Sequence, residues 1–146
     1  MSVTCPVEDR LAIQDVLVAY ANAVDHIGNI EGVLDVFVED AVFDLSGIGL
    51  APMNGHEGIR AFFTNVFANM AHHAHYLTNF AITAYAGDTA SIRAYVIGMG
   101  VGKDGRGVTV NGRYYFDVVR TAGGWKAKRY TMDFLMPLSG TLENAQ

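Results

Sequence analysis

The chain has 146 residues, of which 51% are hydrophobic and only 17% are charged, so it is long enough for one domain with a substantial core. Its formal net charge is −5 and its basic residues are dispersed. This argues against a nucleic-acid partner, because phosphate backbones are bound by clustered Lys and Arg side chains. The low charge content indicates that apolar side chains also line a pocket or a subunit interface.

Neither disulfides nor targeting segments are expected. The one cysteine, Cys5, cannot form an internal disulfide, which favours a reducing compartment. The chain opens without the basic and apolar regions of a signal peptide, and no apolar run approaches the roughly 20 residues of a membrane-spanning helix. The sequence therefore predicts a cytoplasmic protein that does not enter a membrane.

Three helices are predicted in the first half of the chain. The first spans about 7–25, because apolar residues recur at helical spacing from Ile13 to Val24. A second, short helix is predicted at about 30–37. The third spans about 57–70 and carries a wide apolar stripe with several phenylalanines. Each helix thus has a face suited to packing on a core.

Strands dominate the rest of the sequence. A short strand is predicted at 41–45, before the third helix. From His72 onward the apolar period changes to two, and short turns with Gly and Asp separate the runs. Four long strands are predicted there, at about 73–85, 89–101, 107–120 and 125–135. Strands of this length imply a strongly curved antiparallel sheet, whose inner face the three helices would cover.

Several short fragments carry a resemblance to a known family. They are residues 9–13, 38–43, 55–59, 112–115 and 124–126. In this order and spacing, they resemble the SnoaL-like branch of the nuclear transport factor 2-like superfamily. The resemblance implies an α+β fold in which a cone-shaped, strongly curved antiparallel sheet and three N-terminal helices close over an internal pocket. It also implies a single domain over residues 1–146, with its core at about 8–137.

Asp25, at the end of the first predicted helix, and His75, at the start of a strand, form the main candidate site. The pair resembles the Asp–His dyad of lindane dehydrochlorinase, scytalone dehydratase and bile-acid dehydratase, in which a pocket histidine removes a proton and an aspartate orients it. Imidazole suits a general base because its unperturbed pKa is about 6.5. A carboxylate on its other nitrogen fixes the tautomer and stabilises the imidazolium. Alternatively, His75 is a hydrogen-bonded core residue and Asp25 a solvated helix end.

Two further residues are candidate electrostatic helpers. Arg129 has the strand parity of Trp125, which would turn it into the pocket to stabilise a leaving anion, or else it lies on a solvated face beside Lys128. Tyr20 lies on the apolar face of the first helix and could polarise a carbonyl or hydroxyl group, or simply belong to the core. The residues expected to contact the substrate are Phe63, Phe67, Met99, Met132 and Tyr114.

No cofactor or metal is expected. His73 and His75 share one strand face, but no glutamate follows before Thr89, and a metal needs three or more well-placed ligands. Gly98, Gly100 and Gly102 lie at a strand's end without a following helix, so they predict a flexible hairpin end rather than a phosphate-binding loop.

The function predicted is a cofactor-independent lyase that performs a β-elimination, either dehydration or dehydrohalogenation, on a small hydrophobic cyclic substrate. One alternative is a ketosteroid-isomerase-like proton shuttle, which needs a carboxylate base and a neutral acid. Another is an epoxide hydrolase of the limonene type, to which Arg93, Arg113 and Asp117 could contribute. A third is a non-catalytic ligand-binding module, or a structural subunit like the small chain of ring-hydroxylating dioxygenases. The resemblance also implies a homo-oligomer, either trimer or dimer.

Overall fold

The structure is a computed structural model that describes residues 3–146. Its helices are α1 (Val7–Asp25), α2 (Ile30–Asp35), α3 (Gly55–Asn69) and the short 3-10 helices η1 (Ser46–Ile48) and η2 (Glu143–Ala145). Its strands are β1 (Phe37–Asp44), β2 (Met53–Asn54), β3 (Met70–Tyr85), β4 (Thr89–Gly102), β5 (Gly107–Thr121), β6 (Gly124–Phe134) and β7 (Ser139–Gly140). Within these residues, no helix is long and apolar enough to cross a membrane.

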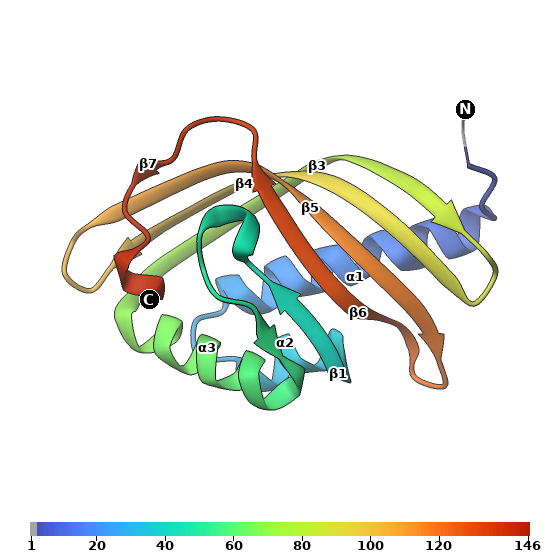
Figure 1. Cartoon of the computed structure of the whole chain (residues 1–146), viewed down its shortest axis with the longest axis horizontal. Helices are drawn as coiled ribbons and strands as arrows, with labels where there is room; N and C mark the ends of the chain where they lie inside the picture. Colours follow the sequence, from blue (N-terminus) through green and yellow to red (C-terminus); the bar gives the residue numbers. More distant parts are fainter. Residues whose placement is uncertain (1–2) are drawn as a thin grey trace.

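The strands form one open, curved sheet in the order β2-β1-β6-β5-β4-β3, with β7 pairing with β5 outside this path. The long strands β3 to β6 follow one another as antiparallel neighbours and curve around α1, while α3 lies nearer the C-terminal end (Figure 1). The α+β architecture with three helices and a curved sheet is therefore confirmed. The spacing of apolar residues was sufficient to predict this architecture, because it changes clearly from the helical period to the strand period of two.

The expectation of a wholly antiparallel sheet is wrong at one place. β1 pairs with β6 in parallel, with Phe37 opposite Ala127 and Phe43 opposite Tyr130, which makes the sheet mixed. This pairing also moves the boundaries, because β1 begins at Phe37 rather than at residue 41, and α2 ends at Asp35. No hairpin turn connects β1 to β6, so no local signal in the sequence specifies their pairing or its direction.

The core lies between α1 and the concave face of the sheet. Helix α1 buries Ile13, Leu17, Tyr20 and Val24, the stripe expected from their spacing. Strand β4 alternates buried and accessible residues over most of its length. As a result, one face of the sheet packs against α1 and the other remains accessible to solvent.

Aromatic rings connect this core to one end of the molecule. Phe43 on β1 stacks on Tyr130 of β6, with ring centroids 4.2 Å apart and ring planes 2° from parallel. Tyr20 of α1 lies at an angle to both, at 6.1 Å and 5.4 Å. Tyr20, Phe43 and Tyr130 also line the cavity that forms the candidate site.

Candidate active site

Asp25 and His75 meet at the end of α1. The ring Nδ1 of His75 lies 2.5 Å from Oδ1 of Asp25. The backbone N–H of His75 donates to the other carboxylate oxygen, Oδ2, at 3.0 Å. The side chains are only 15% exposed for His75 and 29% exposed for Asp25. The carboxylate thus forms two hydrogen bonds with His75, one with the ring and one with the backbone N–H.

This contact determines which ring nitrogen carries the proton. A carboxylate only accepts hydrogen bonds, so in the neutral ring the proton lies on Nδ1 and the lone pair on Nε2. Burial raises the pKa of Asp25, but the hydrogen bonds from the His75 ring and backbone outweigh burial and lower the pKa below its ordinary value. Asp25 therefore stays ionised beside the ring at neutral pH.

Glycines on β4 provide the space for the imidazole rings. His75 pairs with Gly98 across the strands, and His73 pairs with Gly100. A Cβ added at Gly98 would lie 3.1 Å from Cδ2 and 3.2 Å from Nε2 of His75. A Cβ at Gly100 would lie 3.1 Å from Cδ2 of His73. These glycines belong to β4 rather than to a flexible hairpin end, so the earlier interpretation is corrected: they let two rings lie close to the strand.

Replacing Gly98 with alanine is expected to displace the His75 ring and weaken its hydrogen bond to Asp25. The added Cβ comes closer to the ring than ordinary van der Waals contact allows, and two hydrogen bonds to Asp25 limit how far His75 can retreat. Proton NMR of the Nδ1–H resonance measures the effect as a shift and as faster exchange with water. Gly107→Ala is the matched control, because its Cβ meets nothing closer than 3.6 Å. An unchanged resonance in Gly98→Ala would contradict the expectation.

His73 is a second imidazole in the same place. Its Nδ1 lies 3.0 Å from the carbonyl oxygen of Val24, and its ring centroid lies 5.9 Å from that of His75. Burial lowers the pKa of His73, which outweighs the opposing effect of the hydrogen bond to Val24. His73 is therefore neutral at pH 7. Because a carbonyl cannot donate, its proton lies on Nδ1 and its lone pair on Nε2.

Acidification is expected to lower the free energy of unfolding, starting below about pH 6.5. The unfolded chain takes up a proton at the ordinary histidine pKa of 6.5, whereas folded His73 does so only at lower pH. The unfolded state thus binds more protons in this window, and stability falls as pH falls. Asp25, whose pKa is lowered from 3.8, adds the same trend at stronger acidity. Urea unfolding at pH 7.5 and 5.5 should show a smaller loss for His73→Gln; an equal loss would refute this assignment.

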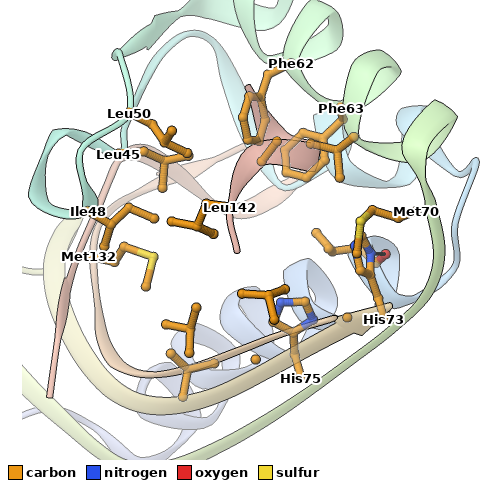
Figure 2. A pocket seen from close by; sticks show the side chains of 18 of the residues that line it. Leu45, Ile48, Leu50, Phe62, Phe63, Met70, His73, His75, Met132 and Leu142 are labelled. Atoms are coloured by element: carbon orange, nitrogen blue, oxygen red, sulfur yellow. Dashed lines mark hydrogen bonds between the residues drawn. The ribbon is translucent and has the colours of Figure 1, made fainter. Parts of the chain in front are cut away.

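A cavity of about 140 Å³ opens beside the two histidines. Figure 2 shows His73 and His75 on one side of it and apolar side chains such as Leu45, Ile48 and Leu142 on the other. Its polar lining residues are Tyr20, His73, His75, Tyr114, Tyr130, Thr141 and Asn144. Among the lining residues of the described chain, none is Lys, Arg, Asp or Glu. The cavity therefore suits a small, uncharged and mostly apolar ligand.

Three tyrosines form the inner wall of the cavity. Burial raises the pKa of Tyr20 and of Tyr114, so both hydroxyl groups remain protonated and able to donate hydrogen bonds. The Tyr130 hydroxyl lies 3.2 Å from the sulfur of Met132 and also interacts with Tyr20 and Tyr114. The hydroxyl groups of Tyr20 and Tyr114 are therefore neutral donors on a largely apolar cavity wall.

The C-terminal segment 141–145 closes part of the cavity. Leu142 points into the space (Figure 2). The segment is held by an ion pair between Glu143 and Arg106, and by a 3.3 Å hydrogen bond from Asn144 to Asp104. Sequence reasoning missed this contribution, because a short irregular segment has no periodic pattern that marks it as part of a wall.

Most of the predicted contact residues line this cavity. Tyr20, Phe63, Met99, Met132 and Tyr114 all do so. Phe67 does not appear in the lining; its ring packs against Phe63 at 5.6 Å and against His73 at 6.3 Å, behind the wall.

Arg129 does not face the cavity, so its predicted orientation is wrong. Its side chain is 45% exposed, and its guanidinium forms an ion pair with Asp44 at 2.9 Å. The reason is a β-bulge: Asp117 pairs with Arg129 while the adjacent Val118 pairs with Ala127, so Lys128 is an extra residue. Beyond the bulge the parity reverses, and the side chains of Tyr130 and Met132 are buried instead.

The residues of the epoxide-hydrolase alternative do not gather in the cavity. Arg93 donates to the carbonyl of Asn79, Arg113 pairs with Asp133, and Asp117 accepts from Ser91 at 2.7 Å. All three lie outside the cavity lining. Within residues 3–146, no group of three or more His, Cys, Asp or Glu side chains is placed to hold a metal ion.

Comparison with known proteins identifies the family and agrees with the fold. Residues 6–131 match the model of the SnoaL-like domain. The chain belongs to this family. A crystal structure from Novosphingobium aromaticivorans, provisionally named an aromatic ring hydroxylase, is 78% identical, has a TM-score of 0.97, and is matched over 98% of this chain and 100% of that one.

Two more distant structural neighbours share the fold. A structure from Novosphingobium aromaticivorans, provisionally named a scytalone dehydratase, is 20% identical with a TM-score of 0.84, covering 92% of this chain and 89% of that one. A hexachlorocyclohexane dehydrochlorinase from Novosphingobium barchaimii is 19% identical with a TM-score of 0.78, covering 94% and 92%. At this identity they show the fold alone.

Proposed function

We propose that this SnoaL-like protein is a cofactor-independent lyase that catalyses β-elimination on a small, cyclic, apolar substrate. The observation that carries the proposal is the hydrogen bond between Asp25 and His75, whose ring lines an apolar cavity. Two structural neighbours with the same fold bear the names of a dehydratase and a dehydrochlorinase, which supports the same class of reaction.

His75 is the proposed base. Its Nε2 lone pair would take a proton from a carbon next to an electron-withdrawing group, and the Asp25 carboxylate would stabilise the imidazolium that results. The electrons of the broken C–H bond form the double bond as the leaving group departs from the neighbouring carbon. The imidazolium can then return its proton to a departing hydroxide, which releases water and restores the neutral base.

The cavity favours dehydration over loss of a halide. No Lys or Arg side chain of residues 3–146 lines it, and Arg129 is engaged with Asp44 outside, so a departing halide meets no permanent positive charge. Neutral donors are present instead, because Tyr20 and Tyr114 keep their protons. They suit the carbonyl oxygen of a β-hydroxy ketone. A volume of about 140 Å³ is close to that of cavities that take up a single benzene ring in other proteins.

Two of the alternatives find less support. A ketosteroid-isomerase-like mechanism needs a free carboxylate base and a neutral acid, but the Asp25 carboxylate is occupied by His75 and no carboxyl group of residues 3–146 lines the cavity. One observation supports a binding module or a dioxygenase-type structural subunit: the 78% identical structure is provisionally named a hydroxylase. Such a protein would tolerate the loss of Asp25 and His75.

Activity measurements on monocyclic β-hydroxy ketones test the proposal. The wild-type protein should form the conjugated enone, detected by its ultraviolet absorbance, and His75→Gln should not. Incubation with cyclic chlorides under the same conditions should release little chloride. Equal turnover by wild type and His75→Gln, or no turnover of any cyclic alcohol or halide offered, would count against a lyase and favour the binding module.

Self-association is proposed on separate grounds. Several large apolar side chains of β3 and β4 are exposed, among them Tyr76 at 58%, Ile97 at 43% and Val101 at 41%. Contact with further copies of the chain would cover them. Sedimentation velocity distinguishes the expected trimer or dimer from a monomer, and a monomer at high concentration would refute the proposal.

A further inference from the structure

His73 is a polar residue of the cavity that the elimination does not use. It lies on β3 two residues before the proposed base, lines the same cavity, and appears beside His75 in Figure 2. Its Nδ1 is engaged by the carbonyl of Val24 at 3.0 Å, and Gly100 leaves room for the ring against β4. The ring is therefore held in one orientation by a hydrogen bond and by packing.

The ring nitrogen Nε2 of His73 is a hydrogen-bond acceptor. Since the carbonyl of Val24 accepts, Nδ1 donates, and the neutral ring has its lone pair on Nε2. No residue of the described chain, 3–146, forms a hydrogen bond with Nε2. An acceptor that lines an apolar cavity is costly to leave unpaired once a ligand has displaced water. A ligand with a hydroxyl group directed at this atom would satisfy it.

We propose that His73 determines specificity by accepting a hydrogen bond from a hydroxyl group that the substrate keeps. That the ligand is a substrate rests on the proposed elimination. The preference for a ligand with a hydroxyl group requires no reaction. The two imidazole centroids are 5.9 Å apart, which is close enough for one small ring to contact both side chains.

The hydroxyl at His73 is the retained one for a chemical reason. A departing hydroxide must gain a proton, and Nε2 of neutral His73 has none to give. A hydrogen bond donated by the leaving hydroxyl to this nitrogen would increase the charge on its oxygen and oppose departure. The substrate class is therefore a monocyclic compound with two oxygen functions besides any carbonyl: one hydroxyl that leaves and one that binds His73.

Phenol and fluorobenzene are suitable probes, because both fit a cavity for one ring and only phenol has a donor. Titration calorimetry should show that wild type binds phenol at least about tenfold more tightly than fluorobenzene. In His73→Phe the ratio should fall toward one, through weaker binding of phenol. His72→Phe is the matched control, since His72 is exposed and does not line this cavity; it should keep the wild-type ratio.

Nitrogen NMR on unaltered wild type gives a second readout that does not depend on the variant folding. Addition of phenol should shift the Nε2 resonance of His73, and fluorobenzene should not. The proposal is overturned if wild type shows no preference for phenol, if His73→Phe keeps the preference, or if only the His75 resonance responds. A protein that prefers phenol through His73 but eliminates nothing would retain this inference and refute the lyase.

Discussion

Asp25→Asn is expected to lower kcat for the proposed elimination by about 10²–10⁴-fold while the chain stays folded. Asparagine matches aspartate in shape but has one acceptor oxygen and one donor NH₂ group. If that oxygen keeps the hydrogen bond from the His75 backbone, the NH₂ group faces Nδ1 of the ring. Nδ1 must then be the unprotonated nitrogen, so the proton moves to Nε2 and the base loses its lone pair toward the cavity.

The same NMR experiment that detects the ring protons checks the cause. Long-range proton–nitrogen spectra should show His75 protonated on Nδ1 in wild type and on Nε2 in Asp25→Asn. Asp44→Asn makes the same change in a carboxylate that pairs with Arg129 away from the cavity, and it should leave both kcat and the His75 tautomer unaltered. Full activity of Asp25→Asn would mean that the pair serves structure only.

Phe43→Ala is expected to lower the free energy of unfolding by about 3–5 kcal/mol. Phe43 is 1% exposed, stacks on Tyr130 at 4.2 Å, and meets the edge of Phe63 at 5.6 Å. Its ring thus joins β1, β6 and α3 at the wall of the cavity. Removing it adds an uncollapsed void to space that is already empty, so the loss should fall at the high end of the range.

Urea unfolding followed by tryptophan fluorescence and by circular dichroism measures this loss. Phe62→Ala provides the comparison, because Phe62 also lines the cavity and lies 5.8 Å from Phe43 but is only partly buried. Its loss of stability should be clearly smaller. Similar losses for the two variants would show that the stack on Tyr130 adds nothing beyond the contact with the cavity.

Local patterns in the sequence were enough to predict the elements but not their long-range pairing. Helix α1 has the predicted bounds, because a charged first turn, a regular apolar stripe and Gly28 mark it. The parallel partner of β1 could not be predicted, since nothing near Phe37 specifies a strand far along the chain. The orientation of Arg129 failed for a similar reason: the bulge at Lys128 depends on the facing strand β5, which the alternation within β6 does not reveal.

The candidate site was only partly accessible from sequence. The residues alone left His75 either a base or a core histidine, and the resemblance to a family pointed to the pair with Asp25. The role of Gly98 could not be predicted from the sequence, because it depends on the His75 ring of β3, which lies against Gly98 where a Cβ would otherwise be. The closing segment around Leu142 was hidden because its position depends on Arg106 and Asp104, which are remote in the chain.

The parallel pairing of β1 with β6 has a consequence for how the protein is made. β2 follows β1 closely in the chain and covers one edge of it, but the other edge, which includes Phe37, has no partner until Ala127 is made 90 residues later. A nascent chain that has reached only β5 therefore exposes an unpaired, apolar strand edge on the ribosome. Closing so long a loop is also entropically slow. Pairing of β6 with β1 is accordingly a late step, and the part of the cavity wall to which Phe43 and Tyr130 contribute forms only once β6 has been made.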